Sequence, residues 1–319
     1  MPKKGCLGFS LPVLAGVLLV FLLLSVTGFI IGPLGRSMFG DLGLPAWLSV
    51  PQPVPELPAE EVFHLFGFPI TNSIIGAWIT IIVLVGFSYV ITRRMKIVPG
   101  RLQSAFELLL GWLYDLCQRV AGEENGRRFF PVVATIFLFV AFNAWLSLIP
   151  GFGSITITTV EGEHVHLLRG ANTDINMPLA LALVSFICVE YFGLRSLGIR
   201  YLGKFINVGQ FFRSVRYIVK GSVRAGLSGL MTGFIHIFVG FLEAMSELVR
   251  IVSFTFRLFG NMTAGEILLL IAAFLVPWVF ALPFYGLELL VGFVQALIFG
   301  GLTLVFLTLA VAHHGGEEA

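Results

Sequence analysis

Long hydrophobic runs separated by short polar segments make up most of this chain. A helix that crosses a bilayer upright needs about 20 apolar residues. Runs of about this length predict membrane-spanning helices at residues 11–31, 71–92, 129–149, 177–194 and 284–311. A sixth apolar region, 227–282, is too long for one upright span, so it holds either two short spans or one long, tilted helix. The pattern predicts an all-α polytopic membrane protein with about six membrane segments.

Three stretches depart from this pattern. Residues 102–120 carry apolar residues at helical spacing with charges between them, which predicts an amphipathic helix on the membrane surface or on a partner. The sequence GEENGRR, 122–128, reads as the turn after that helix. Residues 154–168 alternate polar and apolar positions around an EGE turn, which predicts a β-hairpin outside the membrane. His164 and His166 share a face of this hairpin, but without a third ligand we expect no metal there.

The N-terminal region differs from the rest. Its apolar run is longer than the core of a secretory signal, about 7–15 residues, and lacks an Ala-x-Ala cleavage site, so we expect an uncleaved span. Residues 32–70 are Pro-rich, mildly acidic and poor in Lys and Arg, which favours the outside, and 53–71 is a candidate short amphipathic stretch. We therefore treat residues 1–70, a membrane span and an outside loop, as a region distinct from residues 71–319.

Composition and charge support the membrane assignment. Hydrophobic residues make up 57% of the 319 residues and charged residues 12%, against about 25% charged in soluble domains. The segments RRMKIVPGR and 195–224 are basic, which indicates the inside of the membrane, and the second segment could also bind anionic lipid or an acidic partner. We expect no nucleic-acid partner.

The number of spans determines the side on which the termini lie. Six spans place both termini inside, whereas splitting 227–282 into two spans would place the C-terminus outside. The cysteines, Cys6, Cys117 and Cys188, form no CxxC pair and predict packing roles.

Ionisable residues interrupt the last apolar segments. On one helix, an angular sector of about 80° would contain Glu243, Glu247, Arg250, Arg257 and Asn261, with Glu266 on the face opposite Arg257. Glu288 and Gln295 share a face of the last span. These groups could simply join helices by polar contacts. Their number favours an ion or proton path, because an arginine at bilayer depth is costly and cannot lose its charge. No nucleophile–base arrangement, GxxxxGK[ST] or HExxH motif predicts catalysis.

The segment RLFGNMTAGE, Arg257 to Glu266, resembles subunit a of F-type ATP synthases, the stator half of the membrane proton channel. Further resemblance lies in KIVPGRLQSAFELLLGW, in FFPVVATIFLFVAFNAWLSLIPG, in TDIN before the fourth span and in VQALIF in the last. It extends over about residues 71–312. Two positions depart from the family pattern: Glu288 stands where some members have histidine, and Ser147 stands where others have an acid.

The resemblance implies roles for the polar residues. Arg257 would face the rotating c-ring, and Glu243 with Glu247 would carry protons toward the inside. Residues lining the half-channels would be Asn261, Glu266, Glu288 and Gln295. The last two helices would be long, tilted and joined as a hairpin in the membrane, with both termini cytoplasmic.

The same resemblance implies a partner set and a location. The partners would be the c-ring, the subunit b stalk, the F1 sector indirectly and the lipid bilayer of a bacterial plasma membrane. The chain would have no cofactor and no catalytic activity of its own. A Na⁺-translocating version of the same subunit and a stand-alone channel or transporter remain the alternatives.

Overall fold

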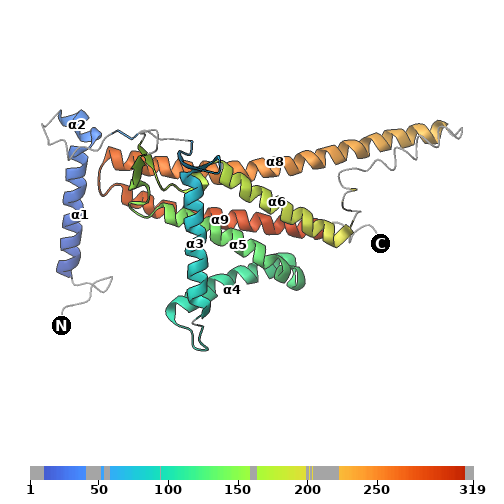
Figure 1. Cartoon of the computed structure of the whole chain (residues 1–319), viewed down its shortest axis with the longest axis horizontal. Helices are drawn as coiled ribbons and strands as arrows, with labels where there is room; N and C mark the ends of the chain where they lie inside the picture. Colours follow the sequence, from blue (N-terminus) through green and yellow to red (C-terminus); the bar gives the residue numbers. More distant parts are fainter. Residues whose placement is uncertain are drawn as a thin grey trace. The chain divides into compact units, whose positions relative to one another are not determined.

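The computed structural model describes residues 11–40, 52–53, 58–93, 95–158, 164–198, 201, 203 and 223–312 (Figure 1). Several predictions lie outside the described residues. These are the basic N-terminus with Cys6, residues 41–51 and 54–57 of the acidic loop, the EGE turn, most of the basic loop, and the C-terminal tail.

Two compact units make up the chain. Unit 1 contains Met1–Ala77, Asn143–Asp174 and Gly260–Val294, and unit 2 contains Trp78–Phe142, Ile175–Phe259 and Gln295–Ala319. The helices in chain order are α1 (Leu11–Ile31), α2 (Pro33–Phe39), α3 (Asn72–Arg93), α4 (Arg101–Ala121), α5 (Glu123–Ser147), α6 (Asn176–Leu197), α8 (Val223–Leu275) and α9 (Ala281–Ala312). Two antiparallel hairpins accompany them, β1 (Glu61–Leu65) with β2 (Phe68–Thr71), and β3 (Thr156–Thr158) with β4 (His164–His166).

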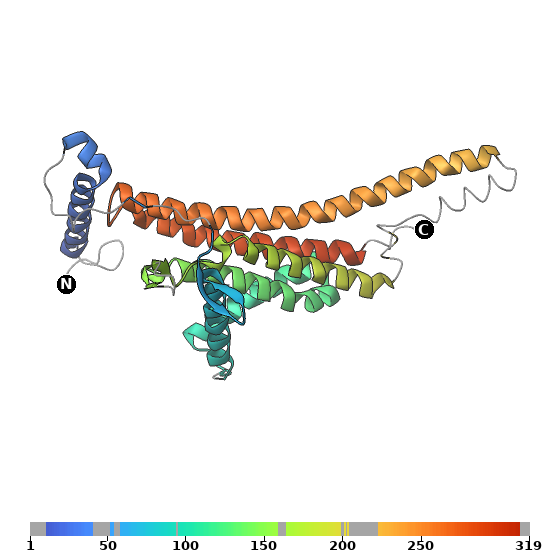
Figure 2. The same cartoon turned by 45° about the horizontal axis from the view of Figure 1, so that its top comes forward.

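The predicted fold class is confirmed. Within the described residues, six helices are long and apolar enough to cross a membrane: α1, α3, α5, α6, α8 and α9. The segment predicted as an amphipathic helix forms α4. The segment predicted as a β-hairpin forms β3–β4, with Ile157 opposite Val165. The long apolar region is one helix, because α8 runs unbroken for 53 residues (Figure 2).

Two predictions about the connecting segments were wrong. GEENGRR is not a turn, because only Gly122 separates α4 from α5. Gly122 has a φ of 81° and its N–H donates to the Gln118 carbonyl at 2.9 Å, so one residue is enough to end α4. Glu123 and Glu124 then occupy the first turn of α5, where negative charge is favourable. The loop 32–70 also contains more structure than predicted, since it holds α2 and most of the β1–β2 hairpin.

In unit 1, glycines allow close approach of backbones. A side-chain carbon at Gly28 would overlap the Pro277 carbonyl, and one at Gly32 would overlap the Leu275 carbonyl, so α1 packs against the end of α8. The Trp145 indole Nε1 donates to the Leu289 carbonyl at 3.1 Å, which joins α5 to α9. These contacts assemble the helices around the polar residues described below.

Unit 2 has an aromatic and polar core. The Phe129 and Phe192 rings meet edge to face at 5.2 Å, and the Phe254 and Phe299 ring centroids are 4.8 Å apart. Ser185 on α6 and Thr303 on α9 share a buried hydrogen bond of 2.8 Å. Within this unit α6 and α8 therefore both pack against α9.

Candidate functional site

A polar cavity of about 310 Å³ lies in unit 1. It is bordered by the end of α5, by the two connections that flank the β3–β4 hairpin, and by parts of α8 and α9. Its polar lining residues include Asn143, Ser147, Arg169, Asn172, Thr173, Glu266, Tyr285 and Glu288. Two of the residues singled out in the sequence, Glu266 and Glu288, therefore share one cavity.

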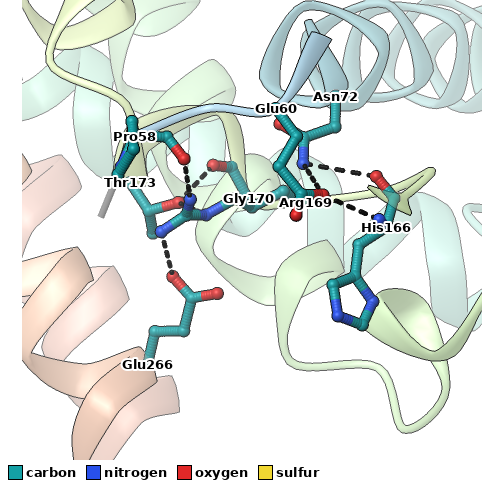
Figure 3. Close-up of polar contacts among 8 residues, drawn as sticks. All are labelled: Pro58, Glu60, Asn72, His166, Arg169, Gly170, Thr173 and Glu266. Carbon is teal, nitrogen blue, oxygen red and sulfur yellow. Dashed lines mark hydrogen bonds and ion pairs between the residues drawn. The ribbon is translucent and has the colours of Figure 1, made fainter. Parts of the chain in front are cut away.

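Arg169 supplies the positive charge of this cavity. Its side chain is only 9% exposed, and its Nη2 donates to Glu266 Oε2 at 3.4 Å (Figure 3). The guanidinium also donates from Nε to Thr173 Oγ1 at 3.1 Å and from Nη1 to the Pro58 carbonyl at 2.9 Å. An arginine held by several hydrogen bonds presents a fixed charge, because these bonds keep its planar guanidinium in one orientation.

Glu288 enters the cavity from α9 and is 7% exposed. Its carboxylate lies against the backbone of Gly265 on α8, where any side chain larger than hydrogen would overlap it. Gly265 directly precedes Glu266, and both glutamates line the same cavity. The lining of this cavity therefore contains two acids and the buried Arg169.

Asn172 indicates that the cavity is wet. It is 1% exposed, and its backbone N–H donates to Asn143 Oδ1 at 3.2 Å. Its own side-chain amide has no hydrogen-bond partner among the described residues. A buried amide without a protein partner is satisfied by water when the space is polar and large enough, and this cavity meets both conditions.

Arg257 lies in unit 2 and is half-buried on α8. Its Nη2 is 3.5 Å from Ser253 Oγ, and its guanidinium carbon is 5.9 Å from the centroid of the Phe254 ring. Within the described part of the chain it makes no ion pair with a carboxylate. Within the described residues, the charge of Arg257 is therefore not neutralised by a carboxylate.

Arg250 on the same helix behaves differently. It forms a short ion pair of 2.6 Å with Glu247, which is 3% exposed, and its guanidinium carbon lies 3.7 Å from the centroid of the Phe306 ring. This arginine is neutralised inside unit 2. The other predicted residues of this unit are Glu243, which is half-buried, and Gln295, which is buried on α9. Asn261 belongs to unit 1 and is exposed on α8.

Part of this site was not predicted from the sequence. The predicted site residues did not include Arg169, Asn172, Asn143 or Tyr285, although TDIN, from Thr173 to Asn176, directly follows Asn172. One signal was present, because Arg169 is a lone basic residue in a segment that is predicted to lie outside and is otherwise poor in Lys and Arg.

These observations define a polytopic α-helical membrane protein with polar residues on its last two membrane helices. A family profile described as ATP synthase A chain matches residues 74–308, which is most of the chain. The chain therefore belongs to the ATP synthase A chain family.

Relatives support the same assignment. ATP synthase subunit a of Moorella thermoacetica is 28% identical over 254 residues, which cover 80% of this chain and 97% of the relative. The corresponding subunit of Geobacter sp. strain M21 is 30% identical over 255 residues, covering 79% and 94%. ATP synthase subunit a 3 of Pelobacter propionicus is 31% identical over 236 residues, covering 74% and 86%.

Proposed function

We propose that this chain is the stator subunit of the membrane sector of an ATP synthase and guides protons to and from a ring of c subunits. It is a non-catalytic component, and the c-ring, a subunit b stalk and, indirectly, the F1 sector are its partners. The membrane is a bacterial plasma membrane, with both termini on the cytoplasmic side. Residues 1–70 form an addition to the subunit a region at 71–319.

The proposal rests on one contrast between two arginines of α8. Arg250 is paired with Glu247, whereas Arg257 makes no ion pair within the described residues. An unpaired charge at membrane depth is costly. A carboxylate that arrives on another subunit removes this cost, and Arg257 in turn favours the ionised form of that carboxylate.

Proton delivery follows from the same chemistry. A c-subunit carboxyl must be neutral while it faces lipid, because burying its charge is too costly. Glu266, Glu288, Gln295 and Asn261 line the path that brings protons to the ring from outside. Glu243 and Glu247 lead protons to the inside. Arg257 stands between the two paths as a cation that cannot act as a proton donor, so protons must travel with the ring.

The experiment is Arg257→Ala in the assembled complex, measured in inverted membrane vesicles. ATP-driven proton pumping and coupled ATP synthesis are expected to be lost. Assembly is checked by copurification of the variant with the c-ring. Pumping near the normal rate in an assembled complex would remove the role given to Arg257.

Transport of Na⁺ by the same subunit is the second candidate. The residues that bind the ion on the ring lie outside this chain, so the choice needs a functional assay. A Na⁺ titration of ATP synthesis with and without a protonophore separates the two ions. Synthesis that persists with the protonophore and requires Na⁺ would identify the sodium version. A stand-alone channel would instead conduct when this chain is reconstituted without a ring.

A further inference from the structure

The β1–β2 hairpin exposes several large apolar side chains. Four of them are at least 44% exposed: Phe63, Leu65, Phe66 and Phe68. The segment 62–71, VFHLFGFPIT, contains no Asp, Glu, Lys or Arg. Exposed apolar clusters of this kind mark surfaces that bind another protein or a membrane.

Strand pairing gathers the apolar side chains on one face of the hairpin, since residues opposite each other across two strands share a face. The apolar face consists of two cross-strand pairs, Phe63 with Ile70 and Leu65 with Phe68. The other face consists of Glu61 with Thr71 and His64 with Pro69. Its polar groups contact each other, because His64 Nε2 is 3.4 Å from Glu61 Oε2. Ile70 is only 5% exposed, so the apolar face is packed at its base and exposed toward its tip.

The tip of the hairpin holds an aromatic residue where the turn favours another type. Phe66 has a φ of 51° and Gly67 a φ of 81°. Two-residue turns with both φ values positive usually contain Asn-Gly or Asp-Gly. Phe66 is nevertheless fully exposed there, and a side-chain carbon at Gly67 would have no neighbour within 4 Å. An unfavourable residue at an exposed turn indicates that its side chain has a use.

The base of the hairpin is fixed to the start of a membrane helix. β2 ends at Thr71, and α3, which is long and apolar enough to cross a membrane, begins at Asn72. The Asn72 N–H donates to the Glu60 carbonyl at 3.0 Å, and Glu60 Oε2 accepts from the His166 N–H at 2.7 Å (Figure 3). The four residues of β2 extend about 13 Å. The exposed apolar face therefore stays within reach of the bilayer surface where α3 enters it.

We propose that the apolar face of the β1–β2 hairpin docks on the lipid bilayer, in the leaflet where α3 begins, with Phe66 inserted deepest. Phe and Leu are typical of the buried face of segments that lie in the membrane interface. Protein interfaces combine apolar contacts with directed hydrogen bonds, whereas the side chains of this face can neither donate nor accept one. Lipid therefore fits this face better than a protein does.

This anchor is separate from the proton path. The hairpin lies before residue 74, where the family match begins, and the inference does not depend on the proposed function. Through Glu60 the anchor also reaches His166 at the end of β4, the strand that leads into the loop bordering the polar cavity. Docking would hold that loop at a constant depth.

The test is a spin-label depth measurement on the purified complex in nanodiscs of phosphatidylethanolamine and phosphatidylglycerol. Single cysteines replace Leu65, Phe66 or Phe68 in a complex without other reactive cysteines, and spin-labelled lipids calibrate the depth. Oxygen, which concentrates in lipid, should relax these labels more than a water-soluble nickel complex does. The labels should lie about 5–10 Å below the lipid phosphates, as in interfacial amphipathic segments, with Phe66→Cys the deepest.

The matched controls are His64→Cys and Glu61→Cys, on the opposite face of the same hairpin. Their labels should be relaxed more by the nickel complex, so accessibility should alternate along β1 between positions 64 and 65. Labels on both faces that are equally accessible to the nickel complex would show that the hairpin lies in water, which overturns the inference. Labels on the apolar face that are shielded from both reagents would show that protein covers it, which overturns it as well.

A second set of variants tests whether the apolar side chains hold the hairpin in place. Leu65→Ser with Phe66→Ser should make a label at Phe68→Cys several-fold more accessible to the nickel complex, because insertion depends on the apolar area buried. His64→Ser should leave that label at its original depth. Copurification of each variant with the complex checks its assembly. An unchanged depth in the assembled double variant contradicts anchoring by these residues.

Discussion

At the scale of single residues, Gly265 leaves room on α8 for the Glu288 carboxylate. The Glu288 carboxylate occupies the place that a side chain at Gly265 would take. Gly265→Ala should therefore displace the Glu288 carboxylate, while alanine favours a helix by about 1 kcal/mol over glycine. We expect a several-fold loss of proton transport with little change in the melting temperature of the complex, because the end of a glutamate side chain can move.

Gly286→Ala is the matched control for this change. Gly286 lies on α9, and no atom approaches within 4 Å of the position its side-chain carbon would take. The control should keep both transport and stability. Equal effects of the two substitutions would show that the contact between Gly265 and Glu288 is unimportant.

Cys117 offers a test of burial on α4. The thiol is fully buried, and this burial raises its pKa to about 11. A raised pKa keeps the thiol protonated at all pH values well below 11, so the reactive thiolate is scarce. In a variant with Cys6 and Cys188 changed to Ser, maleimide labelling should be very slow at pH 7 and accelerate only on strong alkalinisation or unfolding.

A comparison cysteine calibrates that measurement. Leu108→Cys places a thiol on the same helix at a position whose side chain is 76% exposed. In a chain without other cysteines it should label rapidly at pH 7. Similar labelling rates at both positions would contradict the packing of Cys117 against its neighbours.

The residues of the site were predictable to different degrees. Glu266 and Glu288, which line the cavity, could be singled out because a charged side chain stands out in an apolar run. Arg169 could not, because its pairing with Glu266 joins residues 97 positions apart, and hydropathy has no information about contacts at that distance. The hydrogen bonds of Glu60 with His166 and Asn72 were hidden for the same reason, since Glu60 appeared as one acid in a loop.

At the scale of elements, α8 shows what composition can and cannot predict. Its 53 residues correspond to a rod of about 80 Å, against a hydrocarbon layer of about 30 Å. The sequence showed that the apolar region 227–282 is longer than one upright span. It did not exclude two short spans, because hydropathy does not show where a helix ends or turns back. The first proline after the start of α8 is Pro277, beyond its end, which was the signal for one continuous helix.

The ion pair between Glu247 and Arg250 gives a prediction for α8. Removing one partner of a buried pair leaves the other charge uncompensated, at a cost of about 3–5 kcal/mol, whereas replacing both partners is often neutral. Glu247→Leu should therefore strongly reduce the amount of folded subunit in membranes. The double variant Glu247→Leu with Arg250→Met should recover most of it, as judged by immunoblot and thermal stability.

The double variant also separates packing from transport. If Glu247 serves only to neutralise Arg250, the stable double variant should still pump protons. If Glu247 also carries protons, the double variant should be stable and slow. A double variant as unstable as the single one would mean that the pair is not the feature that stabilises this part of α8.

At the scale of the whole molecule, α1 is held by very few contacts. Most of its side chains are exposed, but Gly28 and Gly32 lie against the backbone at the end of α8. This small-xxx-small spacing is typical of close helix packing in membranes. Gly28→Leu with Gly32→Leu should detach α1 and expose Val276, whose side chain lies next to Gly28.

The exposure can be measured with Val276→Cys and a membrane-permeant maleimide. Labelling should be faster in the leucine double variant than in the parent chain. Gly16→Leu lies on the same helix with open space around it, so it should leave the labelling rate unchanged. An unchanged rate in the double variant would show that α1 does not cover this position.

The joint between α4 and α5 has a mechanical consequence. Only Gly122 separates the two helices, and a side-chain carbon at Gly126 would overlap the backbone of Cys117 and Gln118. The junction between α4 and α5 therefore contains no flexible loop that could extend when α4 is pulled. In the proposed complex, a c-ring would exert torque on this chain and a stalk would hold it in place. A load on α4 would then pass directly to α5 through this junction.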